Sequence, residues 1–209
     1  MAEPTPEVRA ARRRLRALRL SLDARWKRSA EQRICMELLR LSALRRGARV
    51  GVYLAMPGEV DLRACFARAW RRGIRLHVPR IASRRRGRMH FVAWTPRTAR
   101  CMNTYGIEEP AGTDGLRPVV DLDVVVLPTL GFDRDGNRLG MGAGFYDRAL
   151  QRRRDDARRW RRPRLVGVAF ACQELPAIAA SPWDVRLDVI VTEREVIVPR
   201  RHLPGRTAG

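Results

Sequence analysis

The chain has 209 residues, and 45% of them are hydrophobic, which is enough for one domain with a sizeable core. Its formal net charge of +21 would suit a nucleic-acid partner, but Lys27 is the only lysine among the 43 basic residues. Such an excess of arginine is as typical of codon usage as of a phosphate-binding surface. Because the chain has no apolar N-terminal segment and no run of about 18 apolar residues, we expect a cytoplasmic protein without a membrane span.

The first segments in chain order are helical. Leu15, Leu18 and Leu22 place one narrow apolar stripe on a basic helix predicted over 12–25. Ser29 and Gln32 have the spacing of a capping box, so a second helix is predicted from there up to Gly47.

A β-α-β unit follows these helices. The segment 48–55 predicts a buried strand, Asp61 can cap a short helix, and 74–79 predicts the next strand. The alternating segment 89–94 predicts a shorter, peripheral strand.

The second half of the chain supplies further strands. The continuous apolar run at 123–128, DVVVLP, is typical of a strand that helices cover on both faces. The segments 165–170 and 189–192 complete the strand set, and 196–199 predicts an edge strand. Together these elements predict a single-domain, three-layer α/β fold over 1–209, with a mostly parallel sheet flanked by helices and with flexible termini at 1–6 and 203–209. Such folds bind ligands at the carboxyl ends of their strands.

The four cysteines are scattered and include no CxxC pair. Most lie in apolar stretches, where a free thiol behaves as a small hydrophobic side chain. We therefore predict reduced cysteines in the core, with no metal or redox role, at Cys35, Cys65, Cys101 and Cys172.

The segment from Arg138 to Asp147, RLGMGAGFYD, has the features of a phosphate-binding loop. Its glycines let backbone amides approach an anion, and the helix predicted from about Phe145 offers unpaired N–H donors. Arg138 can add a forked contact to phosphate oxygens, and Asp147 can hold a Mg²⁺ ion. By itself G-x-G-x-G is a weak signal, since neither of the usual nucleotide-binding glycine spacings is present.

This loop closely resembles the signature R-L-G-x-G-x-G-[FY]-Y-D of the 5-formyltetrahydrofolate cyclo-ligase (5,10-methenyltetrahydrofolate synthetase) family. Other segments resemble the motifs of that family in the same order. They cover nearly the whole chain: RRRLR at 12–16, YLAMPGEVDL at 53–62, YGIEEP at 105–110, LPTLGFD at 127–133, VGVAFACQ at 166–173 and WDVRLDVIVTE at 183–193.

The resemblance implies a reaction in which Mg-ATP phosphorylates the formyl oxygen of 5-formyltetrahydrofolate and N10 then closes the ring. The products are 5,10-methenyltetrahydrofolate, ADP and phosphate. It implies catalytic roles for Arg138 and Asp147, and Mg²⁺ ligands at Asp147 and Asp184. The ATP-binding residues would be Arg12, Arg16, Arg138, Leu139, Gly140, Met141, Gly142, Ala143, Gly144, Phe145 and Tyr146.

For the folate the resemblance implies a pocket in which a carboxylate pairs with the donor edge of the pterin ring. A polyglutamate tail on the substrate would meet the basic surface favourably. The chain departs from the family pattern at Arg12, where lysine is common, and at Ala143, where glycine is common. The pocket residues would be Met56, Glu59, Asp61, Tyr105 and residues 141–145.

Simpler interpretations stay open for most of these residues. Arg12 and Arg16 are also typical of a solvated helix face, Asp147 of a first helical turn and Asp184 of a turn or cap. Glu59 and Asp61 can be loop and cap residues, and Met56 and Tyr105 can be packing residues.

Other functions stay open for the whole chain. It can be a family member that has lost catalysis and binds folate or RNA, or a different Mg-ATP kinase on a related scaffold. The arginine runs at 84–86 and 152–154 have no aromatic residues between them, so we expect solvated faces and no specific nucleic acid. We expect a monomer.

Overall fold

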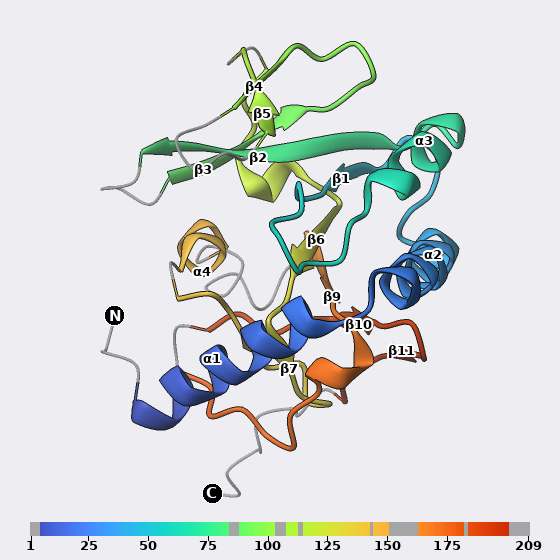
Figure 1. Cartoon of the computed structure of the whole chain (residues 1–209). Helices are drawn as coiled ribbons and strands as arrows, with labels where there is room; N and C mark the ends of the chain where they lie inside the picture. The colour runs from blue at the N-terminus through green and yellow to red at the C-terminus, as the bar shows by residue number, and fades with distance from the viewer. Residues whose placement is uncertain are drawn as a thin grey trace, which may run out of the picture.

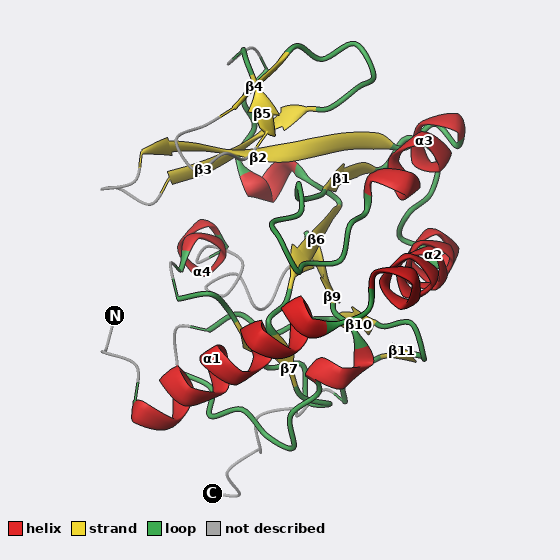
Figure 2. Ribbon diagram, viewed as in Figure 1, coloured by secondary structure: helices red, strands yellow, loops and turns green. Residues whose placement is uncertain are grey.

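The computed structural model describes residues 5–83, 88–102, 108–112, 115–142, 144–150, 163–181 and 184–200. They form a seven-stranded sheet with helices on both faces, which confirms the predicted three-layer α/β fold (Figures 1 and 2). The strand order is β11-β10-β9-β6-β1-β2-β3. The strands are β1 (Arg49–Gly51), β2 (Arg75–Ser83), β3 (Arg88–Ala93), β6 (Val124–Pro128), β9 (Arg164–Val168), β10 (Val189–Val191) and β11 (Val196–Ile197).

The inner strands of this sheet run parallel. β1 pairs in parallel with β2 and β6, and β9 pairs in parallel with β6 and β10. The segments predicted as peripheral and edge strands, β3 and β11, lie at the two ends of the sheet and are antiparallel to their neighbours. Parallel strands end at the same edge of a sheet, so the segments that follow β1 and β6 meet there.

Helices cover the two faces of the sheet (Figure 2). α2 (Ala24–Arg40) and α3 (Arg63–Arg71) bury their apolar side chains in one core cluster, which also holds side chains of β1, β2 and β6. The short helices η1 (Val119–Asp121) and α4 (Phe145–Ala149) pack against a second cluster. A further 3-10 turn, η2 (Ala171–Gln173), follows β9.

α1 (Pro6–Ser21) contributes to a third, smaller cluster, formed by Leu15, Leu130 and Leu139. The helix approaches the chain closely at Gly131, where an added Cβ would lie 2.8 Å from Leu15 Cδ1. A larger residue there would force the Leu15 side chain to move.

Two small antiparallel sheets lie beside the main sheet. One pairs β4 (Arg100–Met102) with β5 (Glu108–Pro110). The other pairs β7 (Gly131–Phe132) with β8 (Arg138–Leu139) and leads directly into the glycine-rich loop. The Asp133 carboxylate closes the turn between β7 and β8, because it accepts hydrogen bonds from the backbone N–H groups of Asp135 at 3.1 Å and Asn137 at 2.9 Å.

The predicted bounds of the first two helices were wrong. α1 begins earlier, at Pro6, with the Thr5 side chain as its N-cap. α2 also begins earlier and is capped by Asp23, whose Oδ1 accepts a hydrogen bond from Trp26 N at 2.8 Å. Ser29 and Gln32 therefore lie inside α2, and their capping-box spacing has no role at a helix end.

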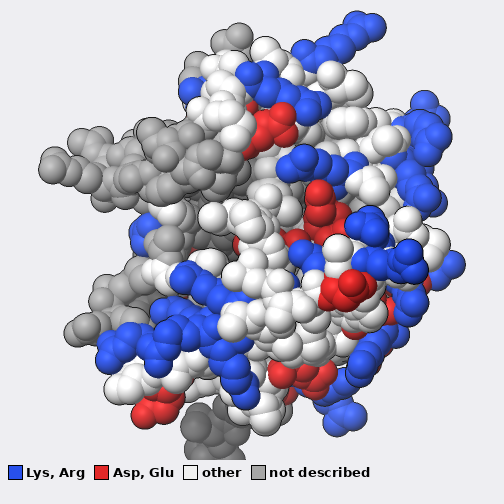
Figure 3. Space-filling model, in the orientation of Figure 1, with Lys and Arg blue, Asp and Glu red and all other residues white. Residues whose placement is uncertain are grey.

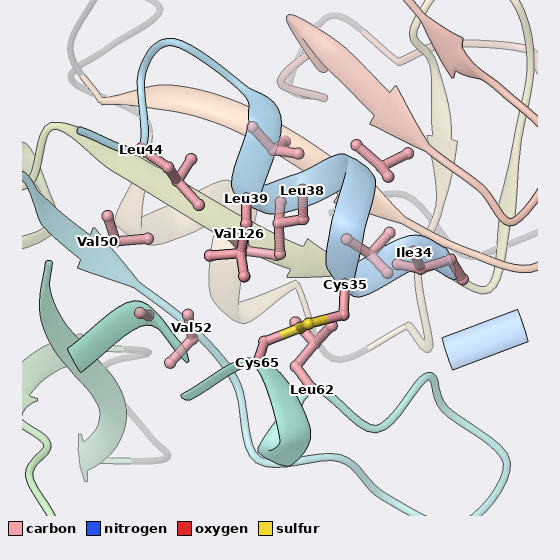
Figure 4. Packing of buried hydrophobic residues seen from close by; sticks show 14 of the residues in the cluster. Ile34, Cys35, Leu38, Leu39, Leu44, Val50, Val52, Leu62, Cys65 and Val126 are labelled. Carbon is pink, nitrogen blue, oxygen red and sulfur yellow. A yellow bond between two sulfur atoms is a disulfide. The ribbon is translucent and has the colours of Figure 1, made fainter. Parts of the chain in front are cut away.

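The prediction for the cysteines was also wrong. Cys35 on α2 and Cys65 on α3 are joined in a disulfide within the core, with their Cα atoms 5.5 Å apart (Figure 4). Cys101 and Cys172 are free but exposed. The two joined residues are 30 positions apart and meet only because α2 and α3 pack side by side, which no local pattern reveals.

No helix in the described ranges is both long and apolar enough to cross a membrane.

A matched pair of valines tests the position of the core. Val126 in β6 is fully buried, whereas Val198, just after β11, is 65% exposed. Val126→Ala should lower the free energy of unfolding by about 2–3 kcal/mol, because it removes buried methyl groups and leaves a cavity. Val198→Ala should change it by less than about 0.5 kcal/mol. Urea unfolding of both variants measures the difference, and equal effects would contradict this placement of β6.

Candidate active site

The candidate site lies where the segments after β1 and β6 meet at the carboxyl edge of the sheet. Residues 52–62 follow β1, and the β7–β8 hairpin with the glycine-rich loop follows β6. α1 runs across this region in front of β7 (Figure 1). Basic side chains spread over α1 on the same side of the molecule (Figure 3). The fold thus places a positive surface beside the loop for which sequence predicted phosphate binding.

The glycine-rich loop uses backbone conformations that favour glycine. Gly142 has φ 101°, and Gly144, the N-cap of α4, has φ 62°. Arg12 lies against this loop, where its Nε donates a hydrogen bond to the Gly140 carbonyl at 3.0 Å. A Cβ added to Gly142 would approach Arg12 Nη1 to 3.2 Å. The structure therefore brings Arg12 to the loop, while Arg16 is exposed one turn further along α1.

The other residues predicted around ATP fall into two groups. Leu139 is buried at the end of β8, and Met141 is exposed in the loop. Phe145 and Tyr146 are partly buried in α4 and pack against the second core cluster. Ala143 lies outside the described residues, as does Tyr105.

Arg138 and Asp147 are paired with each other. The Arg138 guanidinium, whose side chain is only 7% exposed, donates from Nη2 to the Asp147 carboxylate and from Nη1 to the Val185 carbonyl. Asp147 Oδ1 also accepts a long hydrogen bond of 3.5 Å from Val185 N. The expected phosphate ligand and the expected metal ligand therefore neutralise each other beside the loop.

Asp184 directly precedes Val185, whose backbone contacts both members of this pair. It is exposed, and its Oδ2 accepts a hydrogen bond from Ser181 N at 2.8 Å. Within the described ranges, no group of three or more His, Cys, Asp or Glu side chains is placed to hold a metal ion. Two carboxylates suit Mg²⁺, which often takes one or two protein carboxylates and completes its ligands with substrate phosphates and water.

Glu59 is the central residue on the side predicted to bind folate. It is 8% exposed, and its Oε2 accepts a hydrogen bond from Met56 N at 3.1 Å. Burial raises the pKa of the Glu59 carboxyl, and this hydrogen bond and the charge of Arg19 oppose the rise. Burial also raises the pKa values of Tyr53 and Tyr146, and the charge of Glu59 adds to both shifts. Glu59 is thus a buried acid whose charge raises the pKa values of two nearby tyrosines.

Asp61 and Met56 occupy different surroundings. Asp61 Oδ1 accepts a hydrogen bond from Arg63 N at 2.9 Å at the start of α3, where Leu62 and not Asp61 is the N-cap. The Asp61 N–H donates to Glu31 on α2 at 3.1 Å. These contacts favour a structural role for Asp61. Met56 is 39% exposed and Met141 is 37% exposed, so both thioethers are accessible to a ligand.

Sequence reasoning missed Arg19. This arginine ends the row formed by Arg12 and Arg16 on α1, at helical spacings of four and three residues, yet it is only 4% exposed. The spacing was the one available signal. It does not stand out in a helix of 16 residues that contains six arginines.

Comparison with known proteins agrees with this geometry. The family model for the 5-formyltetrahydrofolate cyclo-ligase family matches residues 4–193. A 5-formyltetrahydrofolate cyclo-ligase of Haemophilus influenzae is 30% identical over 191 residues, which cover 90% of this chain and 98% of that protein. A protein of the same name from Escherichia coli K12 is 34% identical over 150 residues, covering 70% of this chain and 79% of that one.

A solved structure has the same fold. The NMR structure of 5,10-methenyltetrahydrofolate synthetase from Aquifex aeolicus superposes with a TM-score of 0.76 and 26% identity, covering 97% of this chain and 96% of that one. Sequence relatives, family model and fold agree over most of the chain. The chain therefore belongs to the 5-formyltetrahydrofolate cyclo-ligase family.

Proposed function

We propose that this protein is an ATP-dependent 5-formyltetrahydrofolate cyclo-ligase, which converts 5-formyltetrahydrofolate and ATP to 5,10-methenyltetrahydrofolate, ADP and phosphate. The observation that carries the proposal is the Arg138–Asp147 pair beside the glycine-rich loop, in a chain that belongs to this family. A phosphate-binding cation and a metal-binding carboxylate at one place are what phosphoryl transfer from a nucleotide requires.

The reaction needs ATP because a formamide oxygen is a poor leaving group. The bond between the γ-phosphorus and ADP breaks as a bond from the formyl oxygen to phosphorus forms. N10 then attacks the activated carbon, phosphate leaves with the former formyl oxygen, and N10 loses its proton as the ring closes. Positioning and charge neutralisation drive such a transfer, so cations and oriented amides matter more than a protein nucleophile.

On this proposal Arg12, Arg16 and Arg138 bind the phosphates of ATP, and the backbone of residues 140–144 surrounds them. Arg138 must exchange its partner, since Asp147 holds its guanidinium in the free protein. When phosphate takes the place of Asp147, the released carboxylate and Asp184 can hold Mg²⁺, which supplies further neutralisation of phosphate charge. Both charges of the pair thus keep a partner, which lowers the cost of the exchange.

The Glu59 carboxylate accepts hydrogen bonds from the donor edge of the pterin ring in this proposal. The remaining contacts to the folate come from Met56, Tyr105 and the loop at 141–145, while Asp61 keeps its structural place at the start of α3. We also propose that the enzyme works as a cytoplasmic monomer. A polyglutamate tail on the substrate would extend over the basic surface of α1.

The reaction itself can be followed by the near-ultraviolet absorbance of the methenyl product. Purified protein with 5-formyltetrahydrofolate should form this product only when Mg-ATP is present, with release of ADP. A folded protein that binds 5-formyltetrahydrofolate without forming product would be an inactive member of the family. Phosphorylation of an unrelated hydroxyl compound, with no response to 5-formyltetrahydrofolate, would contradict the proposal altogether.

Asp147→Asn tests the proposed metal ligand. The variant should keep its fold but lose about 10- to 100-fold in turnover, and it should require more Mg²⁺ for half-maximal rate, because an amide binds the ion less strongly than a carboxylate. Asp135→Asn is the matched control, since Asp135 is an exposed acid in the turn between β7 and β8. Initial rates during a Mg²⁺ titration measure both effects, and an unchanged titration for Asp147→Asn would remove this residue from the metal site.

The raised pKa of Glu59 gives a pH dependence to folate binding. Only the ionised carboxylate accepts two hydrogen bonds from a pterin, so affinity should be greatest above the raised pKa and should fall as pH decreases through it. Glu59→Gln should bind more weakly at neutral pH and should lose this part of the pH dependence. Glu37→Gln on α2 should behave as the unmodified protein. Calorimetric titrations across pH make the comparison, and a pH profile that Glu59→Gln leaves unchanged would exclude Glu59 from the contact.

A further inference from the structure

Arg19 is a buried cation whose hydrogen bonding within the described part of the chain is incomplete. It lies in the last turn of α1 and is 4% exposed, although arginine is almost never buried without a partner. Among the described residues its Nη2 donates to the Met141 sulfur alone, at 3.9 Å, and a thioether is a weak acceptor. Its Nε is buried and has no hydrogen-bond partner among the described residues. A buried donor without a partner is costly, so this group calls for an acceptor.

Arg19 stands between the two segments that form the candidate site. Its contact with Met141 connects it to the glycine-rich loop. On the other side the chain before Glu59 approaches its stem, since a Cβ added to Gly58 would lie 3.5 Å from Arg19 Cβ. The guanidinium is therefore at the place where residues 56–60 face residues 140–142.

Glu59 is an opposite charge that acts on Arg19. Burial lowers the pKa of Arg19, and the charge of Glu59 opposes this shift. In return Arg19 opposes the rise in the pKa of Glu59. The two side chains nevertheless form no ion pair in the described part of the chain. Their attraction therefore leaves the hydrogen-bonding groups of both side chains available to a ligand.

We propose that Arg19 is a substrate-binding residue whose guanidinium donates to the C4 carbonyl oxygen of the folate ring, beside the ring donors that Glu59 accepts. The pterin ring presents an amide N–H and an amino group next to this carbonyl, so its edge carries donors and an acceptor side by side. A carboxylate and a guanidinium at neighbouring positions match this pattern. The proposal rests on the proposed function and adds a residue to it.

The surroundings of Arg19 favour the folate over the nucleotide. The Glu59 carboxylate would repel a phosphate group held by Arg19. Met141 supplies an apolar contact of the kind that suits a ring system. Arg12, by contrast, contacts the backbone of the glycine-rich loop itself, at the Gly140 carbonyl.

The test compares Arg19→Met with Arg14→Met, because Arg14 is an exposed arginine of the same helix that takes no part in the site. Calorimetry measures the affinity of each purified variant for 5-formyltetrahydrofolate and, separately, for a non-hydrolysable ATP analogue with Mg²⁺. Arg19→Met should weaken folate binding by about 10- to 100-fold and nucleotide binding by less than about twofold. Arg14→Met should leave both unchanged. Equal losses for the two ligands would overturn the proposal in favour of a phosphate contact.

A second ligand and a second variant locate the contact on the ring. The loss caused by Arg19→Met should persist with a 5-formyltetrahydropterin that lacks the aminobenzoylglutamate portion. If the loss disappears with this analogue, Arg19 binds the tail and the proposal is wrong. Arg19→Lys, which keeps the charge without the planar fork, should recover part of the affinity. Normal binding of 5-formyltetrahydrofolate by the Arg19→Met variant would also refute the proposal.

Failure of the proposed function would look different. In that case the unmodified protein itself would not bind 5-formyltetrahydrofolate, whichever residue stands at position 19. Thermal unfolding of each variant shows that a loss of affinity is not a loss of fold, and the retained nucleotide affinity of Arg19→Met provides the same control within one sample.

Discussion

The parallel alignment of β1, β6 and β9 determines where every other part of the site lies. Because these strands point the same way, the chain leaves β1 and β6 at the same edge of the sheet. The loop with Glu59 and the hairpin with Arg138 therefore face each other, although almost 80 residues separate them in sequence. α1 then packs over this edge through Leu15. The site is thus a consequence of strand direction more than of any single motif.

Buried charge is the second constraint, and the protein handles it in two ways. Arg138 is compensated directly, by the Asp147 carboxylate and the Val185 carbonyl. Arg19 is compensated only at longer range, by the charge of Glu59. A direct pair must be opened before a ligand can bind, whereas an incomplete one is ready to accept a ligand atom. This difference suits Arg138 to a step in which partners change, and Arg19 to recognition.

The strands and the loop were predictable because their signals are local. Long apolar runs such as 123–128 have few alternatives to a buried strand, and the glycine-rich loop with its flanking Arg138 and Asp147 forms a continuous motif. The start of α2 was predicted wrongly because the capping-box spacing of Ser29 and Gln32 is also a local signal, whereas the helix begins earlier, after Asp23. The Cys35–Cys65 contact and the burial of Arg19 depend on which helices and loops meet. Neither follows from a pattern within one segment.

The position of α1 connects the two halves of the site. Arg12 contacts the glycine-rich loop at Gly140, Arg19 contacts it at Met141 and also responds to the charge of Glu59, and the two arginines are seven positions apart on one helix. Seven residues are about two turns, or roughly 10 Å along the axis, so both side chains project from the same face. Any shift of α1 along its axis would move both arginines together. The helix therefore fixes the distance between a nucleotide contact and a folate contact. Phosphoryl transfer from one ligand to the other requires this distance to stay constant.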